Sequence, residues 1–318
     1  MLSPIGRWPK LLACTLVASS LLAQAVSAND RLVSPSGVGS RGWLPISDLH
    51  LASASVRPVQ SDATAASDDA EEEEEDAIET DRPDFTEASS NIPAGRAQLE
   101  AGYTFTYNDD DGVRSRAHSA PELLYRIGMT DQLELRIGWN YLVEQTRGHT
   151  SNPRTSLNDN ADGAADLYLG LGVALLEQCG WIPEAKINLQ TTAPTGADAF
   201  SSDKFNPGFN LLYGWDLNDF LAVGMSTGIN TATEDDDDFV KYSQSFTIGY
   251  SLSEQLGAYT ELFGIFSSDS AANAPENYFN GGLTYKVTPD FQLDIRAGVG
   301  LNDHADDFFT GAGFAIRY

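Results

Sequence analysis

Apolar and polar residues alternate with a period of two from Arg96 to the C-terminus. In residues 97–107 the odd positions carry Ala, Leu, Tyr and Phe, whereas the even positions carry Gln, Glu, Gly and Thr. Residues 132–144 repeat the pattern, with Leu, Ile, Trp, Tyr and Val on one parity. Successive side chains of a β-strand point to opposite faces, so this period predicts strands with one apolar and one polar face.

The alternation recurs often enough to predict an all-β fold of about twelve strands. Strong segments follow at 166–175, 184–190, 240–250 and 291–299. Weaker segments lie near 116–127, 206–215, 220–231, 256–267, 278–287 and 308–318. A soluble sandwich would also alternate, so the choice between a sandwich and a membrane barrel needs further features.

The connections between these segments alternate in length. Short turns are expected near 129–131, 177–181, 216–219, 253–255 and 288–290. Longer loops are expected near 108–114, 145–163, 194–204, 232–239, 267–276 and 302–307. Short turns on one side and long loops on the other are typical of outer-membrane barrels. With an even strand count, both ends of the barrel lie on the short-turn side.

Aromatic residues mark the expected membrane boundaries. Apolar-face rings lie near the short turns, for example Tyr213 and Trp215, and near the long loops, for example Trp139 and Tyr141. Such rings favour the headgroup level, which predicts two girdles. Hydrocarbon offers no partner for a bare backbone amide, so the strands must close on themselves. The sequence therefore predicts a closed antiparallel transmembrane β-barrel over residues 96–318, apolar outside and polar inside.

Composition and motifs exclude several other classes. The 318-residue chain has a net charge of 19 − 46 = −27, which argues against nucleic-acid binding. Past residue 28 no run of about 18 apolar residues exists to form a membrane-spanning helix. No HExxH, GxSxG, P-loop or CxxC motif is present. His118 and Ser119 are adjacent and so face opposite ways on a strand. We expect no catalytic residues, no bound metal and no cofactor.

The N-terminal region predicts export. Residues 1–28 have a basic start, an apolar stretch and a small-residue end, which indicates a signal peptide cleaved after Ala28. Residues 11–14 also look like a lipoprotein cleavage box, but Lys10 directly precedes them and the apolar stretch follows them. Residues 29–79 are expected to be a disordered acidic linker, because the acidic run at 71–76 repels itself. The expected location is the outer membrane.

Several motifs resemble a known bacterial family. The segment Glu-Thr-Asp-Arg-Pro-Asp-Phe-Thr at 79–86 resembles the entry motif of outer-membrane proteins called "putative MetA-pathway of phenol degradation" transporters. Further matching segments lie at 92–95, 98–102, 163–167, 259–264 and 293–302. The resemblance covers roughly residues 79–318. It implies a channel for small solutes, with aromatic or other hydrophobic compounds as the class.

The entry motif and the polar face supply the candidate site residues. Asp81, Arg82, Pro83 and Asp84 lie in residues 80–95, which either form a plug at the short-turn mouth or an ordered lead-in. The expected lumen-lining charges are Glu100, Glu122, Arg126, Glu134, Arg136, Asp166, Glu184, Lys186, Lys241, Glu261, Asp294, Arg296 and Arg317. These charges can pair and fill the barrel, or they can screen solutes in a polar lumen.

The expected function is therefore passive diffusion of small solutes through a polar, mixed-charge lumen. The alternative is a plugged structural or surface-interaction barrel, which the acidic loops and linker motivate. Expected partners are outer-membrane lipid and a small-molecule solute. The last segment ends in an outward aromatic, Tyr318, which resembles the signal by which the barrel-assembly machinery recognises its substrates.

Overall fold

The computed structural model describes residues 77–110, 112–149, 156–234, 237–268 and 274–318. The expected signal peptide, and the expected linker as far as residue 76, lie outside the described residues. None of the described residues forms a helix that is long and apolar enough to cross a membrane. What they form is one antiparallel sheet.

The described residues contain thirteen strands. The first seven are β1 (Ala97–Asp110), β2 (Val113–Thr130), β3 (Leu133–His149), β4 (Ser156–Ala164), β5 (Leu167–Leu176), β6 (Glu184–Ala193) and β7 (Asn206–Asn218). The others are β8 (Leu221–Glu234), β9 (Asp237–Ser251), β10 (Leu256–Ser267), β11 (Glu276–Thr288), β12 (Phe291–Gly300) and β13 (Phe308–Arg317).

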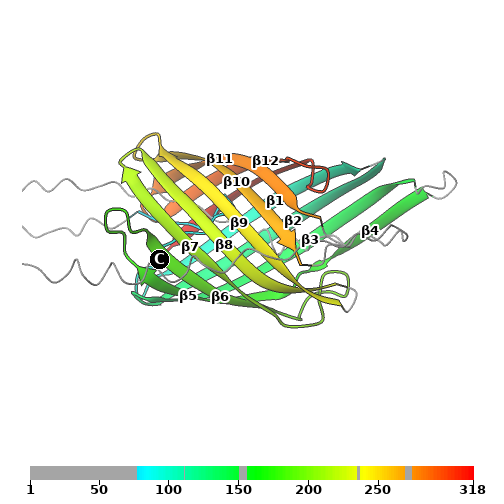
Figure 1. Ribbon diagram of the computed structural model, residues 1–318, viewed down its shortest axis with the longest axis horizontal. Helices are drawn as coiled ribbons and strands as arrows, with labels where there is room; N and C mark the ends of the chain where they lie inside the picture. The colour runs from blue at the N-terminus through cyan, green and yellow to red at the C-terminus, as the bar shows by residue number, and fades with distance from the viewer. Residues whose placement is uncertain (1–76, 111, 150–155, 235–236, 269–273) are drawn as a thin grey trace, which may run out of the picture. The chain divides into compact units, whose positions relative to one another are not determined.

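The sheet closes into a ring because its first and last strands pair. The β1–β13 register runs from Gln98↔Arg317 to Tyr107↔Phe308. Strands β4 and β5 pair with successive parts of β3, so together they occupy one position in the ring. Thirteen strands therefore fill 13 − 1 = 12 positions, and the prediction of a closed barrel of about twelve strands is confirmed. Figure 1 shows the strands tilted across the view, as closure requires.

The prediction of a loop at 145–163 is wrong. Strand β3 continues to His149, and β4 begins at Ser156 and pairs with it up to Tyr141↔Ala164. Strands β1, β2, β8 and β9 likewise extend into the expected loops at 108–114 and 232–239. Backbone ladder bonds need no apolar side chain, and Asn158–Asn160 are exposed. Hydrophobic alternation therefore marks only the lipid-facing part of a strand.

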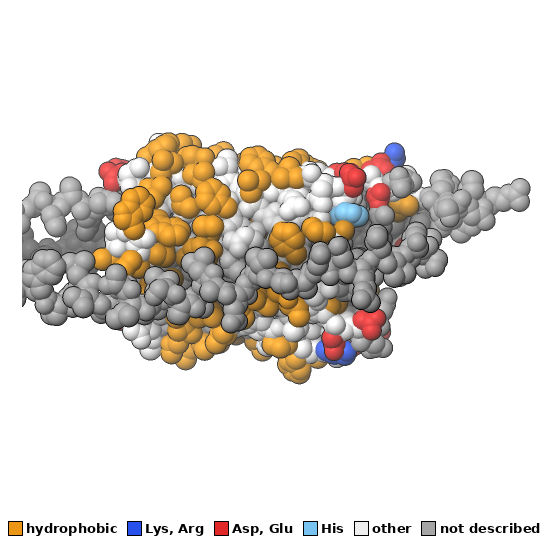
Figure 2. Space-filling model, viewed as in Figure 1, with side chains coloured by type: hydrophobic (Ala, Val, Ile, Leu, Met, Phe, Trp, Pro, Cys, Tyr) orange, Lys and Arg blue, Asp and Glu red, His pale blue; other side chains and the backbone are white. Residues whose placement is uncertain are grey.

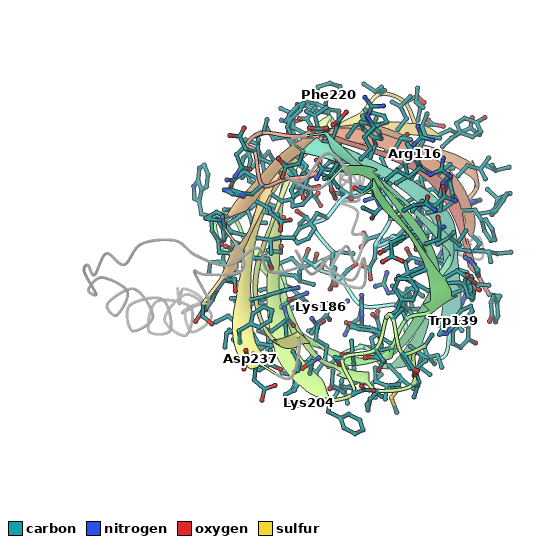
Figure 3. The ribbon with its side chains drawn as sticks, turned by 90° about the vertical axis from the view of Figure 1, so that its right-hand side faces the viewer. Arg116, Trp139, Lys186, Lys204, Phe220 and Asp237 are labelled. Carbon is teal, nitrogen blue, oxygen red and sulfur yellow. The ribbon has the colours of Figure 1, made fainter. Side chains whose placement is uncertain are left out.

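The barrel wall is apolar outside and polar inside. On β12, Leu293, Ile295 and Val299 are 43%, 54% and 42% exposed, whereas the intervening Asp294 and Arg296 are both only 4% exposed. Figure 2 shows hydrophobic side chains over the wall, with Asp and Glu gathered at the long-loop end. Figure 3 looks along the barrel, and it shows Lys186 pointing into the interior while Trp139 and Phe220 lie outside.

The face assignment can be tested on one strand. Ile137 and Leu133 share the outward face of β3, but Leu133 begins the strand at a short turn. We expect Ile137→Arg to destabilise the folded barrel in lipid vesicles by about 2–4 kcal/mol, since the charge then lies near mid-bilayer. Leu133→Arg, the matched control, should cost about 0–1 kcal/mol because it lies near the interface. Equal costs in urea unfolding would contradict this assignment of depth.

Candidate functional site

Residues 77–95 are here called the inner segment, which lies inside the barrel except for the exposed residues 93–95 at the short-turn mouth. The Ile78 N–H donates to the Pro289 carbonyl in the turn after β11, and the Gly95 N–H donates to the Gly128 carbonyl near the end of β2. The inner segment therefore enters and leaves at the short-turn end. Ile78 is fully buried, so order begins earlier than the boundary at residue 79 that we expected for the linker.

Three wall carboxylates hold the backbone of the inner segment. Glu100 on β1 accepts the Asp81 and Arg82 N–H groups, each at 3.0 Å. Glu134 on β3 accepts the Ile92 N–H at 2.7 Å. Glu261 on β10 accepts the Phe85 and Thr86 N–H groups. The three strands stand apart around the ring, so the inner segment is fastened to the wall from several directions.

Glu261 is surrounded by neutral donors. Its carboxylate accepts the Phe85 N–H at 2.7 Å and the Thr86 N–H at 2.8 Å. The Thr86 and Thr247 hydroxyls donate to it at 2.7 and 2.8 Å, and the Asn280 amide donates at 2.7 Å. A buried carboxylate is costly unless its oxygens are hydrogen-bonded, so these donors fix the position of Phe85.

Arg82 occupies a space left by two glycines. Its guanidinium donates to Glu122 on β2 at 2.9 Å and to Asp294 on β12 at 3.2 Å. Gly102 and Gly313 are register partners across the β1–β13 seam, and a Cβ at either would come within 2.2 or 2.3 Å of the Arg82 side chain. Burial alone would lower the pKa of Arg82. The neighbouring carboxylates of Asp294 and Glu122 outweigh this effect and raise the pKa above its ordinary value, so the group stays charged.

Asp81 lies in a cluster of cations from β2, β3 and β6. Its carboxylate contacts Arg126 at 3.3 Å and also pairs with Arg136. Burial raises the pKa of Asp81, but Arg126, Arg136 and Lys186 together hold it below its ordinary value. Glu134 bonds the same cations, with Lys186 at 3.3 Å. Charges of both signs are thus compensated inside the barrel.

Ten of the thirteen predicted lumen charges gather around the inner segment. Arg296 donates to the Pro83 carbonyl at 3.2 Å, and Glu184 accepts the Ser89 hydroxyl at 2.8 Å. Asp84 is buried beside them. The residues brought together are Glu100, Glu122, Arg126, Glu134, Arg136, Glu184, Lys186, Glu261, Asp294 and Arg296.

The other three predicted charges have separate surroundings. Asp166 accepts the Thr195 and Gly196 N–H groups at 3.0 and 2.9 Å, which ties the loop after β6 to the wall. Arg317 pairs with Asp290 at 2.7 Å in a short turn. Lys241 lies over the Phe239 ring, 5.7 Å from its centroid. These residues do not belong to the site around the inner segment.

Sequence analysis missed an aromatic surface on the inner wall. Phe263 on β10, Tyr278 on β11 and Phe309 on β13 are at most 5% exposed and pack with Phe85 of the inner segment. We expected this face to carry glycine and charge. Position along the strand could have predicted the aromatic surface. Phe263 lies two residues from the inward Glu261 and so shares its face, and Phe309 is adjacent to the outward Phe308 and so faces inward.

A cleft remains beside the inner segment. It is small, with a volume of about 40 Å³, and lies between Thr86–Ser89 and the short-turn ends of β7 and β8, with Tyr213 and Val223 on its wall. His118 and Ser119 are not part of it: His118 bonds Tyr103 on the outer face, and Ser119 is buried. Among the described residues, no group of three or more His, Cys, Asp or Glu is placed to hold a metal ion.

This chain is similar to one protein family and to several solved outer-membrane proteins. The family model described as "Putative MetA-pathway of phenol degradation" matches residues 80–318. The COG4313 outer membrane channel from Pseudomonas putida F1 superposes with a TM-score of 0.56 at 15% identity, over 72% of this chain and 98% of that chain. The NanC and KdgM porins superpose with TM-scores of 0.42 at 12% and 11% identity, each over 69% of this chain and 98% of theirs. A comparison with curated proteins gave no significant match.

Replacing Arg82 tests how firmly the inner segment is held. Arg82→Ala leaves Glu122 and Asp294 buried without their cation, so we expect a loss of about 3–5 kcal/mol in the free energy of unfolding. The matched control is Arg114→Ala, which removes an exposed pair with Asp109 and should leave the unfolding curve unchanged. Denaturant unfolding of both variants measures the difference. Equal behaviour of the two variants would show that the buried pairs do not stabilise the barrel.

Proposed function

We propose that this chain, which belongs to the family described as "Putative MetA-pathway of phenol degradation", is an outer-membrane channel for small solutes. The observation that supports the proposal is the inner segment. It lies ahead of β1 and enters and leaves at one end, so its withdrawal would leave the β1–β13 seam closed. The inner segment would then be a removable plug in a barrel that stands without it.

Passive diffusion is the proposed mechanism. With the inner segment withdrawn, the inner wall would present Glu100, Glu134, Glu261 and the neighbouring cations to water. A lumen lined by both signs of charge screens solutes by size and charge without consuming energy. The proposed solutes are small hydrophobic or aromatic compounds, because the family is described by phenol degradation and the wall carries aromatic rings.

A reversible disulfide tests whether the inner segment closes the channel. The Thr86 hydroxyl of the inner segment lies 2.7 Å from the Ser245 hydroxyl on β9. The sulfur atoms of cysteines at both positions would therefore lie close enough to form a disulfide, whose S–S bond is about 2.05 Å long. On a Cys179→Ser background, we expect the oxidised variant to show minimal conductance in planar bilayers and the reduced variant to show discrete openings.

The control places the same bond within the wall. Ser226 on β8 and Ser245 are register partners with hydroxyls 2.6 Å apart, so Ser226→Cys with Ser245→Cys crosslinks two strands and leaves the inner segment free. Oxidation of this control should not alter conductance. Equal conductance of the oxidised and reduced Thr86–Ser245 variants would show that the inner segment is not the closure. Absence of conductance and solute uptake in every state would overturn the channel itself.

A second candidate function is a structural barrel that stays closed. The bonds from the inner segment to β1, β3, β6, β10 and β12 favour it, since a well-bonded interior resists opening. This candidate predicts no openings even after reduction of the crosslink. The disulfide experiment therefore separates the two functions.

The proposed solute class is tested with a matched pair of solutes. Benzoate and cyclohexanecarboxylate have the same charge and nearly the same size, and their charge slows passage through lipid alone. We expect liposomes that contain the reduced barrel to take up benzoate severalfold faster, because its planar ring can stack on the wall aromatics. Equal uptake rates would restrict the proposal to a channel without aromatic preference.

We propose that the last strand has a role in assembly of the barrel in the outer membrane. Strand β13 ends at Arg317, and the Tyr318 hydroxyl bonds the Tyr125 hydroxyl at 2.9 Å on the outside of the barrel. An aromatic side chain at this end suits the headgroup level. We propose that this strand is what the barrel-assembly machinery recognises.

A further inference from the structure

We propose that the aromatic surface formed by Phe263, Tyr278 and Phe309 is a binding site for the planar ring of a small aromatic solute, and that Phe85 occupies it in the closed state. The proposal rests on the proposed channel function and adds to it a site, a ligand class and a means of regulation.

Phe85 is seated as a stacked ligand would be. Its ring lies parallel to Phe263, with centroids 4.4 Å apart and an interplanar angle of 1°. Phe263 in turn stacks on Tyr278 at 4.8 Å and 17°. Stacked aromatic pairs gain energy beyond the area they bury. Phe85 comes from the inner segment and the other rings from the wall, so the contact can separate without breaking the barrel.

The wall surface is shaped for rings. A Cβ at Gly298 would come within 2.2 Å of the Phe309 ring, so only glycine lets that ring lie across β12. The Tyr278 hydroxyl donates to Glu276 and accepts the Asp306 N–H, which fixes its orientation. The Arg296 guanidinium lies 5.2 Å from the Phe309 centroid. These contacts belong to the wall, so the surface persists when Phe85 leaves.

An exposed aromatic surface in an aqueous lumen is unfavourable unless something covers it. Burial of apolar area is worth about 25 cal/mol per Å², so a ring that replaces Phe85 recovers what its departure loses. A solute ring and Phe85 therefore compete for one position. The Glu261 carboxylate bonds the Phe85 and Thr86 N–H groups, so displacement of the Phe85 ring also strains the fastening of the inner segment.

Amides elsewhere on the inner wall favour a polar substituent on the aromatic solute. Strands β6, β7 and β8 carry a chain of amides, and in strand order β7 lies opposite β13, which carries Phe309. Gln190 donates to Asn230 at 2.6 Å, and Asn230 donates to Asn210 at 3.3 Å. Amide side chains both donate and accept, so they suit a hydroxyl or carboxylate on the solute. The ligand class is a planar aromatic ring with such a group.

The test compares 4-hydroxybenzoate with its saturated counterpart, 4-hydroxycyclohexanecarboxylate, on the purified full-length barrel. Phe85→Ala empties the site, and we expect it to bind 4-hydroxybenzoate about tenfold tighter than wild type by calorimetry, which equals about 1.4 kcal/mol. The saturated compound should gain nothing. Phe85→Ala combined with Phe263→Ala should lose the gain, whereas Phe314→Ala, which removes an outward ring, should behave as wild type.

The outcomes are separable. If folded Phe85→Ala binds 4-hydroxybenzoate no tighter than wild type, or if both compounds gain equally, the site is overturned. Should Phe85→Ala not fold, Phe85→Leu keeps an apolar side chain without a stack, and it must bind the aromatic compound tighter than wild type for the site to stand. Binding without conductance in the reduced crosslink variant would overturn the channel alone, and conductance without binding would overturn the site alone.

Discussion

The buried carboxylates of the inner wall are the constraint on which the rest of the interior depends. A closed barrel turns one face of every strand inward, and here that face carries acids that must find donors. Glu100, Glu134 and Glu261 find them in backbone N–H groups of the inner segment as well as in wall side chains. The inner segment is thus a partner of the wall, and its own buried backbone is satisfied by the same bonds.

The charged side chains of the interior can pair with one another and also select solutes, so the two interpretations are compatible. The hydrogen-bond donors to Glu261 among the described residues are neutral, whereas the partners of Asp81 and Glu134 include Arg126, Arg136 and Lys186. One side of the inner segment is therefore held by hydrogen bonds and the other by charge. Because the charged groups on that side are buried, salt in the solvent screens their pairing only weakly.

Sequence reasoning succeeded where the signal is local. Parity along one strand separates Leu293 from Asp294, so closure, strand number and inward charges were within reach. The Asp-Arg-Pro-Asp motif left open whether residues 80–95 form a plug or an ordered lead-in, and the partners of these residues in the wall could not be predicted. Phe85 and Glu261 are 176 residues apart, and no local pattern encodes that contact. Strand β4 and the aromatic surface were missed because neither follows the apolar-out, polar-in rule that made the other strands visible.

The glycine pair beneath Arg82 has a consequence for the order of events during biogenesis. Gly102 and Gly313 belong to the first and last strands, so the place that receives the guanidinium does not exist until the final strand zips onto the first. Asp294, which also holds Arg82, arrives with the penultimate strand. Arg82 therefore reaches its final position only when the first and last strands have paired, and a docked Arg82 indicates a closed barrel.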